Sequence, residues 1–209
     1  KGFNGAVKTG FENIQSQDFT YASEFNLTVK HLAVAKLNDK GVELRSHPVM
    51  LSKNSSLAGL KGVRNGIQFD TNLLGEFHVA GSGAGRESTA SGLISDLFAL
   101  SRFNGSSPMH YPDFSKKPNL LNFDDLIFKY YVYLEVKDEP GVLALISKIF
   151  ADQGISFDKV IQKDQLDNGN VPVVIFTDQI IENEMQTALK GLENHPVISN
   201  SKIIRIEDL

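Results

Sequence analysis

The sequence predicts an α+β protein of two domains: a mixed sheet with helices over residues 1–104 and a ferredoxin-like βαββαβ domain over residues 125–209. Three observations predict this fold. In the first half, β-rich runs and apolar helical spacing alternate along the chain. The second half gives the order strand, helix, strand, strand, helix, strand in about 80 residues, which is the split-βαβ arrangement. Between them, residues 105–124 are rich in proline, glycine and serine and lack periodicity, so they indicate a linker.

The first domain opens with a helix and a hairpin. We expect the helix over residues 16–25, because Ser16 can cap its start and apolar residues recur every three positions. Two strands follow over residues 27–37 and 42–51, joined by a four-residue turn that ends in glycine, which is a hairpin signal. Pro48 has no N–H to donate to a ladder, so it predicts that the end of the second strand lies at an edge or a bulge.

A second strand pair and a long helix complete the first domain. The strands are expected over residues 66–69 and 75–80, and a glycine-rich segment follows at residues 81–86. Residues 89–103 then show helical periodicity, with an apolar stripe formed by Leu93, Leu97 and Leu100.

The second domain begins with strict alternation of apolar and polar residues over residues 128–137, which predicts a strand with one buried face. Gly154 is placed to end the first helix. The remaining elements are a helix over residues 142–150, strands over 155–165 and 171–177, a helix over 181–192 and a strand over 202–207. Two helices on one face of an antiparallel sheet leave the other face for water or a partner.

Composition excludes several classes of protein. Of the 209 residues, 41% are hydrophobic and 22% charged, as in ordinary globular domains. The chain contains no cysteine, which excludes disulfides and thiolate–metal sites and favours a reducing compartment, the cytoplasm. The net charge of −4 offers no basic excess, and no apolar run approaches the roughly 18 residues of a membrane span. We therefore expect neither nucleic acid nor a membrane as a partner.

Two segments of the second half resemble an ACT domain, the small module that senses amino acids in biosynthetic enzymes. They are residues 136–143 (Val-Lys-Asp-Glu-Pro-Gly-Val-Leu) and residues 149–156 (Ile-Phe-Ala-Asp-Gln-Gly-Ile-Ser). The resemblance implies an effector site at the turn between the first strand and first helix, with L-threonine as the expected effector. Its residues are Asp138, Pro140, Gly141 and Val142, with Ile155 and Ser156 facing them. The alternative is an ordinary helix start, for which aspartate and proline are also typical.

The first half resembles the C-terminal part of the catalytic and dimerisation region of homoserine dehydrogenase. The most specific match is residues 81–91 (Gly-Ser-Gly-Ala-Gly-Arg-Glu-Ser-Thr-Ala-Ser), supported by residues 17–22 and 29–36. This resemblance implies NAD(P)-dependent interconversion of L-homoserine and L-aspartate 4-semialdehyde by a homo-oligomer, a dimer or a tetramer. It also implies that Gly83, Ala84 and Gly85 contact the cofactor, which is held mainly by an N-terminal nucleotide-binding domain.

That nucleotide-binding domain and the catalytic segment of the family are missing from the sequence. The family carries its catalytic acid and lysine in the form Asp-x-x-Gly-x-Asp-x-x-x-Lys, and no such pattern occurs here. The chain begins at Lys1 rather than methionine, so we interpret it as a piece of a longer protein that does not transfer a hydride by itself and contains no catalytic residue. The alternative function is a non-catalytic amino-acid-binding regulatory protein.

The glycine segment and the histidines leave alternatives open. The spacing Gly-x-Gly-x-Gly-Arg is not the Gly-x-Gly-x-x-Gly of a dinucleotide fold, so spacing alone favours a tight strand-to-helix turn over a ligand contact. Ser88 or Thr89 can cap the helix that follows. The five histidines show no metal-ligand spacing, and His31 and His78, in predicted strands, are interpreted as structural.

Overall fold

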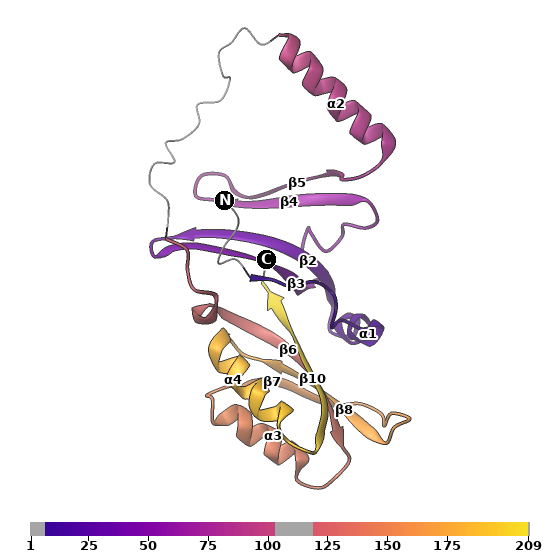
Figure 1. Ribbon diagram of the computed structural model, residues 1–209, viewed down its shortest axis with the longest axis vertical. Coiled ribbons are helices and arrows are strands. Elements are labelled where there is room, and N and C mark those ends of the chain that lie inside the picture. The colour runs from indigo at the N-terminus through magenta and orange to yellow at the C-terminus, as the bar shows by residue number, and fades with distance from the viewer. Residues whose placement is uncertain (1–6, 103–118, 209) are drawn as a thin grey trace. The chain divides into compact units, whose positions relative to one another are not determined.

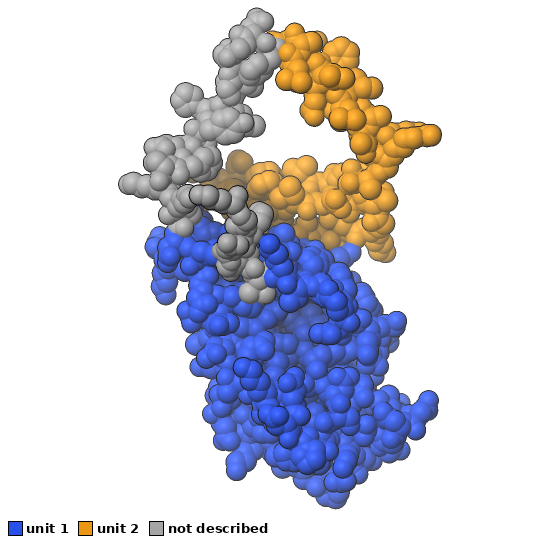
Figure 2. Space-filling view, in the orientation of Figure 1, with its two compact units in different colours: residues 1–52, 118–209 blue, residues 53–117 orange. Residues whose placement is uncertain are grey.

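The computed structural model describes residues 7–102 and 119–208 (Figure 1). The chain forms two compact units, one of residues 1–52 and 118–209 and one of residues 53–117 (Figure 2). The first unit therefore combines the beginning of the chain with its end. The domain limits at 1–104 and 125–209 stay a prediction from sequence order. Most of the predicted linker over residues 105–124 lies outside the described residues.

The α+β class and the βαββαβ order of the second half are confirmed. The first unit contains β1 (Val7–Lys8), α1 (Ser16–Glu24), β2 (Leu27–Asn38), β3 (Gly41–Ser52), the short 3₁₀ helix η1 (Phe123–Asp125), β6 (Ile127–Lys137), α3 (Val142–Ala151), β7 (Phe157–Gln162), β8 (Asn170–Thr177), β9 (Ile180–Ile181), α4 (Glu182–Glu193) and β10 (Ile198–Glu207). The second unit contains β4 (Arg64–Thr71), β5 (Gly75–Ser82) and α2 (Arg86–Ser101). None of these helices is long and apolar enough to cross a membrane.

One sheet runs through the whole first unit in the order β1-β3-β10-β6-β8-β7, with β2 paired to β3 and β9 to β6. The junction is the parallel pairing of β10 with β3, from Arg205 opposite Val49 to Glu207 opposite Leu51. The βαββαβ domain and the β2–β3 hairpin therefore share one hydrogen-bonded sheet. Sequence patterns predicted both pieces but not this pairing, because it joins segments more than 150 residues apart.

Pro48 lies inside β3, which continues to Ser52. Its neighbour on one side is His31 of β2. On the other side, β1 pairs with β3 only as far as Ser46, and β10 starts to pair at Val49. The ladder changes partners at Pro48, and a residue without an N–H is tolerated at such a gap.

The βαββαβ sheet is buried on both faces, so the predicted open face is wrong. Helices α3 and α4 cover one face, as predicted. Helix α1 covers the other, where Ala22 packs with Tyr131 and Tyr133, which are both fully buried. The alternating pattern of residues 128–137 placed these tyrosines at its polar positions. A tyrosine ring is nevertheless apolar and is commonly buried when its hydroxyl has a hydrogen-bond partner. Tyr131 donates to Asp18 and Tyr133 to Glu135.

The second unit is a hairpin followed by an isolated helix. Strands β4 and β5 pair without a break from Arg64 opposite Ser82 to Thr71 opposite Gly75. Gly75 adopts a positive φ of 68° in the connecting turn, a conformation that glycine takes without strain. Helix α2 has no buried residue.

Candidate functional site

The turn between β5 and α2 favours glycine at two positions. At Gly83, the backbone N–H donates to the carbonyl of Val63 at 2.7 Å, and a Cβ would lie 2.0 Å from the side-chain nitrogen of Asn65. At Gly85, φ is +126°, which L side chains rarely adopt. The chain therefore presents bare backbone at this turn, with Ala84 between the two glycines.

The start of α2 is left without a side-chain cap. Gly85 is the residue before the first helical turn, and no side chain accepts from the N–H groups of that turn. Ser88 and Thr89 instead donate to the carbonyl of Gly85, at 3.0 and 2.8 Å, so the prediction that either caps the helix is wrong. A hollow of about 350 Å³ opens at this point, lined by Ser82, Ala84, Gly85, Arg86, Glu87 and Ser88.

The turn between β6 and α3 forms the second candidate site. Gly141 precedes the helix with φ +91°, and again no side chain caps the helix start. Asp138, Glu139 and Pro140 are exposed, whereas Val142 is buried at 6% exposure. Of the two residues expected to face the turn, Ile155 is buried in the same core as Val142, and Ser156 is exposed. Val142 and Ile155 thus offer backbone rather than side chain to anything bound here.

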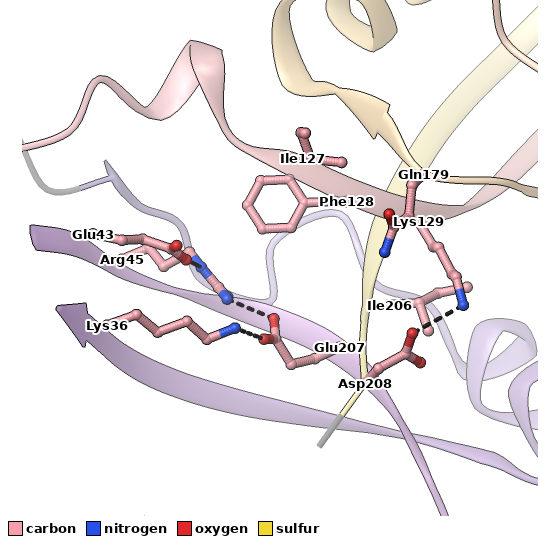
Figure 3. A pocket seen from close by; sticks show the side chains of 10 residues that line it. All are labelled: Lys36, Glu43, Arg45, Ile127, Phe128, Lys129, Gln179, Ile206, Glu207 and Asp208. Carbon is pink, nitrogen blue, oxygen red and sulfur yellow. Dashed lines mark hydrogen bonds and ion pairs between the residues drawn. The ribbon is translucent and has the colours of Figure 1, made fainter. Parts of the chain in front are cut away.

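A cluster of buried charges at the junction of β3 and β10 was not predicted. Arg45 donates from Nη2 to Glu207 Oε2 at 2.6 Å and also bonds Glu43, and Lys36 donates to Glu207 Oε1 at 2.6 Å (Figure 3). The side chains of Arg45 and Glu207 are 1% and 4% exposed. The signal in the sequence is Glu43, Arg45 and His47 at every second position, which places three titratable side chains on one face of a strand.

His47 lies in the same cluster and is 1% exposed. Its Nδ1 is 3.0 Å from the carbonyl oxygen of Pro48, and its Nε2 is 3.3 Å from Nη1 of Arg45. A carbonyl only accepts and a guanidinium only donates, so the hydrogen-bond pattern assigns the hydrogen to Nδ1. Burial, together with the charges of Arg205 and Arg45, lowers the pKa of His47 to about 4.

Two more buried carboxylates hold helices onto the sheet. Glu182, at the start of α4, accepts from the Tyr130 hydroxyl at 2.7 Å and from Arg205 at 2.7 and 2.5 Å. Burial alone raises the pKa of Glu182, but the hydrogen bonds and charge of Arg205 outweigh burial, and the pKa lies below its usual value. Asp18 of α1 plays the corresponding part on the opposite face of the sheet. It accepts a hydrogen bond from the Lys202 ammonium at 2.6 Å.

Among the residues that the structure describes, the other histidines do not gather into a site. His31 lies in β2 with Nε2 3.0 Å from the Ser46 hydroxyl, and His78 is exposed on β5. In the described parts of the chain, no three His, Asp or Glu side chains are placed to hold a metal ion.

Comparison with known proteins assigns the family. A family model described as homoserine dehydrogenase matches residues 3–98, and one described as an ACT domain matches residues 130–194. A homoserine dehydrogenase of Helicobacter pylori is 36% identical over 95% of this chain and 47% of its own length. The chain belongs to the homoserine dehydrogenase family. The resemblances carried by residues 81–91 and by residues 136–156 are thereby confirmed.

Other homoserine dehydrogenases agree. That of Pseudomonas aeruginosa is 31% identical and covers 99% of this chain and 50% of its own length. The crystal structure of a homoserine dehydrogenase from Thiobacillus denitrificans matches with a TM-score of 0.86 at 29% identity, over 99% of this chain and 48% of that one. The chain spans about half the length of the curated relatives it matches.

Proposed function

We propose that this chain is part of an NAD(P)-dependent homoserine dehydrogenase that interconverts L-homoserine and L-aspartate 4-semialdehyde in amino-acid biosynthesis. The observation that carries the proposal is the family match over residues 3–98, which includes the bare glycine turn before α2. The Asp-x-x-Gly-x-Asp-x-x-x-Lys pattern does not occur among the 209 residues. The 209-residue chain alone is therefore expected to be inactive, and hydride transfer requires residues from the rest of the protein.

Gly83, Ala84 and Gly85 are the proposed cofactor contacts. The turn fits such a role because a ligand can approach its backbone closely, and because N–H groups at the start of a helix favour an anionic or carbonyl oxygen. When bound, NAD(P) supplies or accepts the hydride. The hollow at this turn suits one end of a dinucleotide and not the whole of it, so most of the cofactor's binding energy must come from elsewhere in the protein.

Helix α2 supports the same proposal. It exposes five large apolar side chains, each more than half accessible: Leu93, Ile94, Leu97, Phe98 and Leu100. Contiguous exposed apolar surface of this kind marks a region that another part of a protein covers. We propose that residues outside this chain cover α2 and bring the cofactor to the turn that precedes it.

The cofactor assignment is tested in the intact enzyme with two methyl-group additions. Gly85→Ala places a Cβ where φ is +126° and is expected to raise the cofactor KM about tenfold, with less change in the homoserine KM. Gly81→Ala is the matched control, because nothing lies within 4 Å of a Cβ there. Cofactor KM values that are equal in the two variants would contradict the assignment.

The ACT domain is proposed to bind an amino-acid effector, L-threonine, at the turn before α3. Uncapped N–H groups at the start of α3 suit an α-carboxylate, and Asp138 suits an α-ammonium. The proposed effector site comprises Asp138, Pro140, Gly141, Val142, Ile155 and Ser156. Calorimetric titration with L-threonine should give a Kd that Asp138→Asn raises and that Asp158→Asn, an exposed aspartate on β7, leaves unchanged. No heat at millimolar L-threonine would mean that the turn is only structural.

We also propose a homo-oligomer, dimer or tetramer, in the cytoplasm. The hairpin of the second unit supports it, because one of its faces carries two adjacent apolar cross-strand pairs: Ile67 opposite Val79 and Phe69 opposite Phe77, all 39–60% exposed. Sedimentation of the intact protein tests the proposal, and a monomer at micromolar concentration would contradict it.

A second candidate function is a non-catalytic amino-acid-binding regulatory protein. The ACT match and the missing Asp/Lys pattern favour it. The gene sequence upstream of the codon for Lys1 distinguishes the two: a nucleotide-binding domain followed by the Asp/Lys segment supports the enzyme, and its absence supports the regulator.

A further inference from the structure

A small charged pocket lies where the β2–β3 hairpin meets the βαββαβ sheet, and none of its lining residues belongs to the glycine turn or to the turn before α3. It encloses about 160 Å³. Strands β2, β3, β6 and β10 all line it, so its walls come from both ends of the sequence (Figure 3). Its volume corresponds to about five water molecules, which suits a small metabolite and excludes a nucleotide.

The charges of the pocket lie in two layers. At the bottom, Arg45 and Glu207 form an ion pair whose side chains are nearly inaccessible and whose geometry is held by further bonds to Glu43 and Lys36. At the rim, Lys129 pairs with Asp208 at 2.9 Å, and these side chains are 40% and 68% exposed. An exposed pair of this kind contributes little to stability, so it opens at low cost. The bottom is therefore preorganised, and the rim is free to rearrange.

We propose that this pocket binds a small zwitterion, a free α-amino acid with an aliphatic side chain. Three cations and three carboxylates line the pocket, so its formal charge is zero and a ligand of net charge zero leaves it balanced. An ammonium has three donors, and the bond to Asp208 takes one of those of Lys129, which leaves others for a ligand carboxylate. Asp208, as a carboxylate, can accept from a ligand ammonium as well.

The other lining residues are the polar Gln179 and three apolar residues, Ile127, Phe128 and Ile206. Ile127 is 58% exposed, whereas Phe128 is only 6% exposed. Covering such surface with a short aliphatic group is favourable by about 25 cal/mol for each Å² removed from water. Figure 3 shows Ile127 and Phe128 on one side and the Lys129–Asp208 pair on another, which is the separation of apolar and charged ends found in an aliphatic amino acid.

The location gives such a ligand a defined effect. Lys36 and Arg45 belong to the hairpin of the first half, and Lys129 and Asp208 to the ACT half. A ligand between them contacts both sides of the β3–β10 ladder and stabilises the junction by binding only the paired form. This proposal does not depend on the effector site at the turn before α3, and the experiment separates the two.

The test is ¹⁵N-NMR titration of the 209-residue chain with L-valine and two half-molecules of the same shape. Isobutyrate carries only the carboxylate and isobutylamine only the ammonium. L-valine is expected to shift the amide resonances of Lys129, Glu207 and Asp208, with a Kd at least about tenfold below that of either half-molecule. Isobutyrate binding as tightly as L-valine would overturn the proposal, because the pocket would then be an anion site.

Three variants locate the binding. Lys129→Gln and Asp208→Asn are expected to raise the Kd for L-valine about tenfold, because each removes a charge-assisted hydrogen bond. Lys159→Gln is the matched control, an exposed lysine of β7 paired with an aspartate, and should leave the Kd unchanged. A Kd that only Asp138→Asn raises, or no shift at millimolar L-valine, would overturn the pocket assignment. The first result would place the ligand at the turn before α3 instead.

Discussion

Helices α4 and α2 both carry apolar residues at helical spacing, but only those of α4 are buried. Helix α4 buries Met185, Ala188, Leu189 and Leu192 against the sheet. Helix α2 is longer and carries more large apolar residues, yet it buries none. Apolar periodicity therefore shows that a helix needs a partner, and it does not show whether the partner belongs to the same stretch of chain. In the homoserine dehydrogenase family, whose relatives are about twice as long as this chain, the partner of α2 is expected elsewhere in the protein.

The contrast extends to the two units. In the first unit, both faces of the βαββαβ sheet are covered, and buried carboxylates fix the covering helices at their first turns. In the second unit, the β4–β5 hairpin keeps an apolar face open. The unfolding free energy of this chain should therefore come mainly from the first unit. Substitutions in the second unit should change that free energy little until the rest of the protein is present.

The largest effect is expected at Arg205. Arg205→Met keeps most of the aliphatic stem but removes the charge that compensates Glu182, which is 1% exposed. A buried carboxylate without its partner costs about 3–5 kcal/mol. Urea denaturation at pH 7 measures the loss, and Arg102→Met at the end of α2 is the control that should leave stability unchanged. Equal midpoints for the two variants would show that Glu182 is solvated or protonated in the native protein.

A direct test of the contrast exchanges one apolar residue in each helix for alanine. Met185→Ala in α4 removes a fully buried side chain and should cost about 2–5 kcal/mol. Leu97→Ala in α2 removes a side chain that is 65% exposed and should change the unfolding free energy of the 209-residue chain by less than about 0.5 kcal/mol. In the intact enzyme, the Leu97→Ala variant should become destabilising. Similar losses for both variants in the short chain would mean that α2 already has a partner there.

Local patterns predicted most of the secondary structure because helix and strand signals depend on neighbours in sequence. The hairpin turns, Gly154 with its φ of +71° and the βαββαβ order all follow from such signals. The contacts that local patterns did not predict form between segments far apart in the sequence. The β3–β10 pairing and the packing of α1 on Tyr131 join residues more than 100 positions apart, and no periodicity encodes that.

The candidate sites divide in the same way. The turns at residues 83–85 and 138–142 could be located because glycine and proline mark backbone conformation directly, whereas their proposed roles come from the family resemblances. The cluster around Arg45 and Glu207 was missed because these two central residues are separated by 162 positions in the sequence. A charged residue in a predicted strand is assumed to face solvent until its partner is known. Ser88 and Thr89 were misassigned as caps because a hydroxyl near a helix start can bond either to an N–H or, as here, to a carbonyl.

An intermediate effect is expected from pH. The pKa of His47 is about 4 in the folded protein and roughly 6.5 when unfolded, so between these values the unfolded chain binds a proton that the folded chain does not. Stability should therefore fall as the pH drops below about 6.5, with this group accounting for about 2 kcal/mol between pH 7 and pH 5. Urea denaturation of the wild type and of His47→Gln at both pH values measures it. An equally steep loss in the variant would assign the pH dependence to other groups.

The smallest expected effect comes from adding a single methyl group to each of the two helices. Gly92 in α2 and Gly191 in α4 are both interior helix glycines, and alanine there should stabilise a helix by about 1 kcal/mol. Nothing lies within 4 Å of a Cβ at Gly92, so Gly92→Ala should give the full gain, seen as slower amide exchange in α2. At Gly191 the Cβ would lie 3.3 Å from Cγ2 of Ile149, so Gly191→Ala should gain less or nothing.

Repeating Gly191→Ala in an Ile149→Ala background tests whether the contact with Ile149 is what limits the gain at Gly191. With the isoleucine side chain shortened, Gly191→Ala should recover the helix gain, and the difference between the two backgrounds is the coupling between α3 and α4. A gain at Gly191 equal to that at Gly92 in both backgrounds would show that α3 and α4 pack loosely. The buried helix would then be no more constrained by its neighbour than the exposed one, and the contrast between the two units would rest on burial alone.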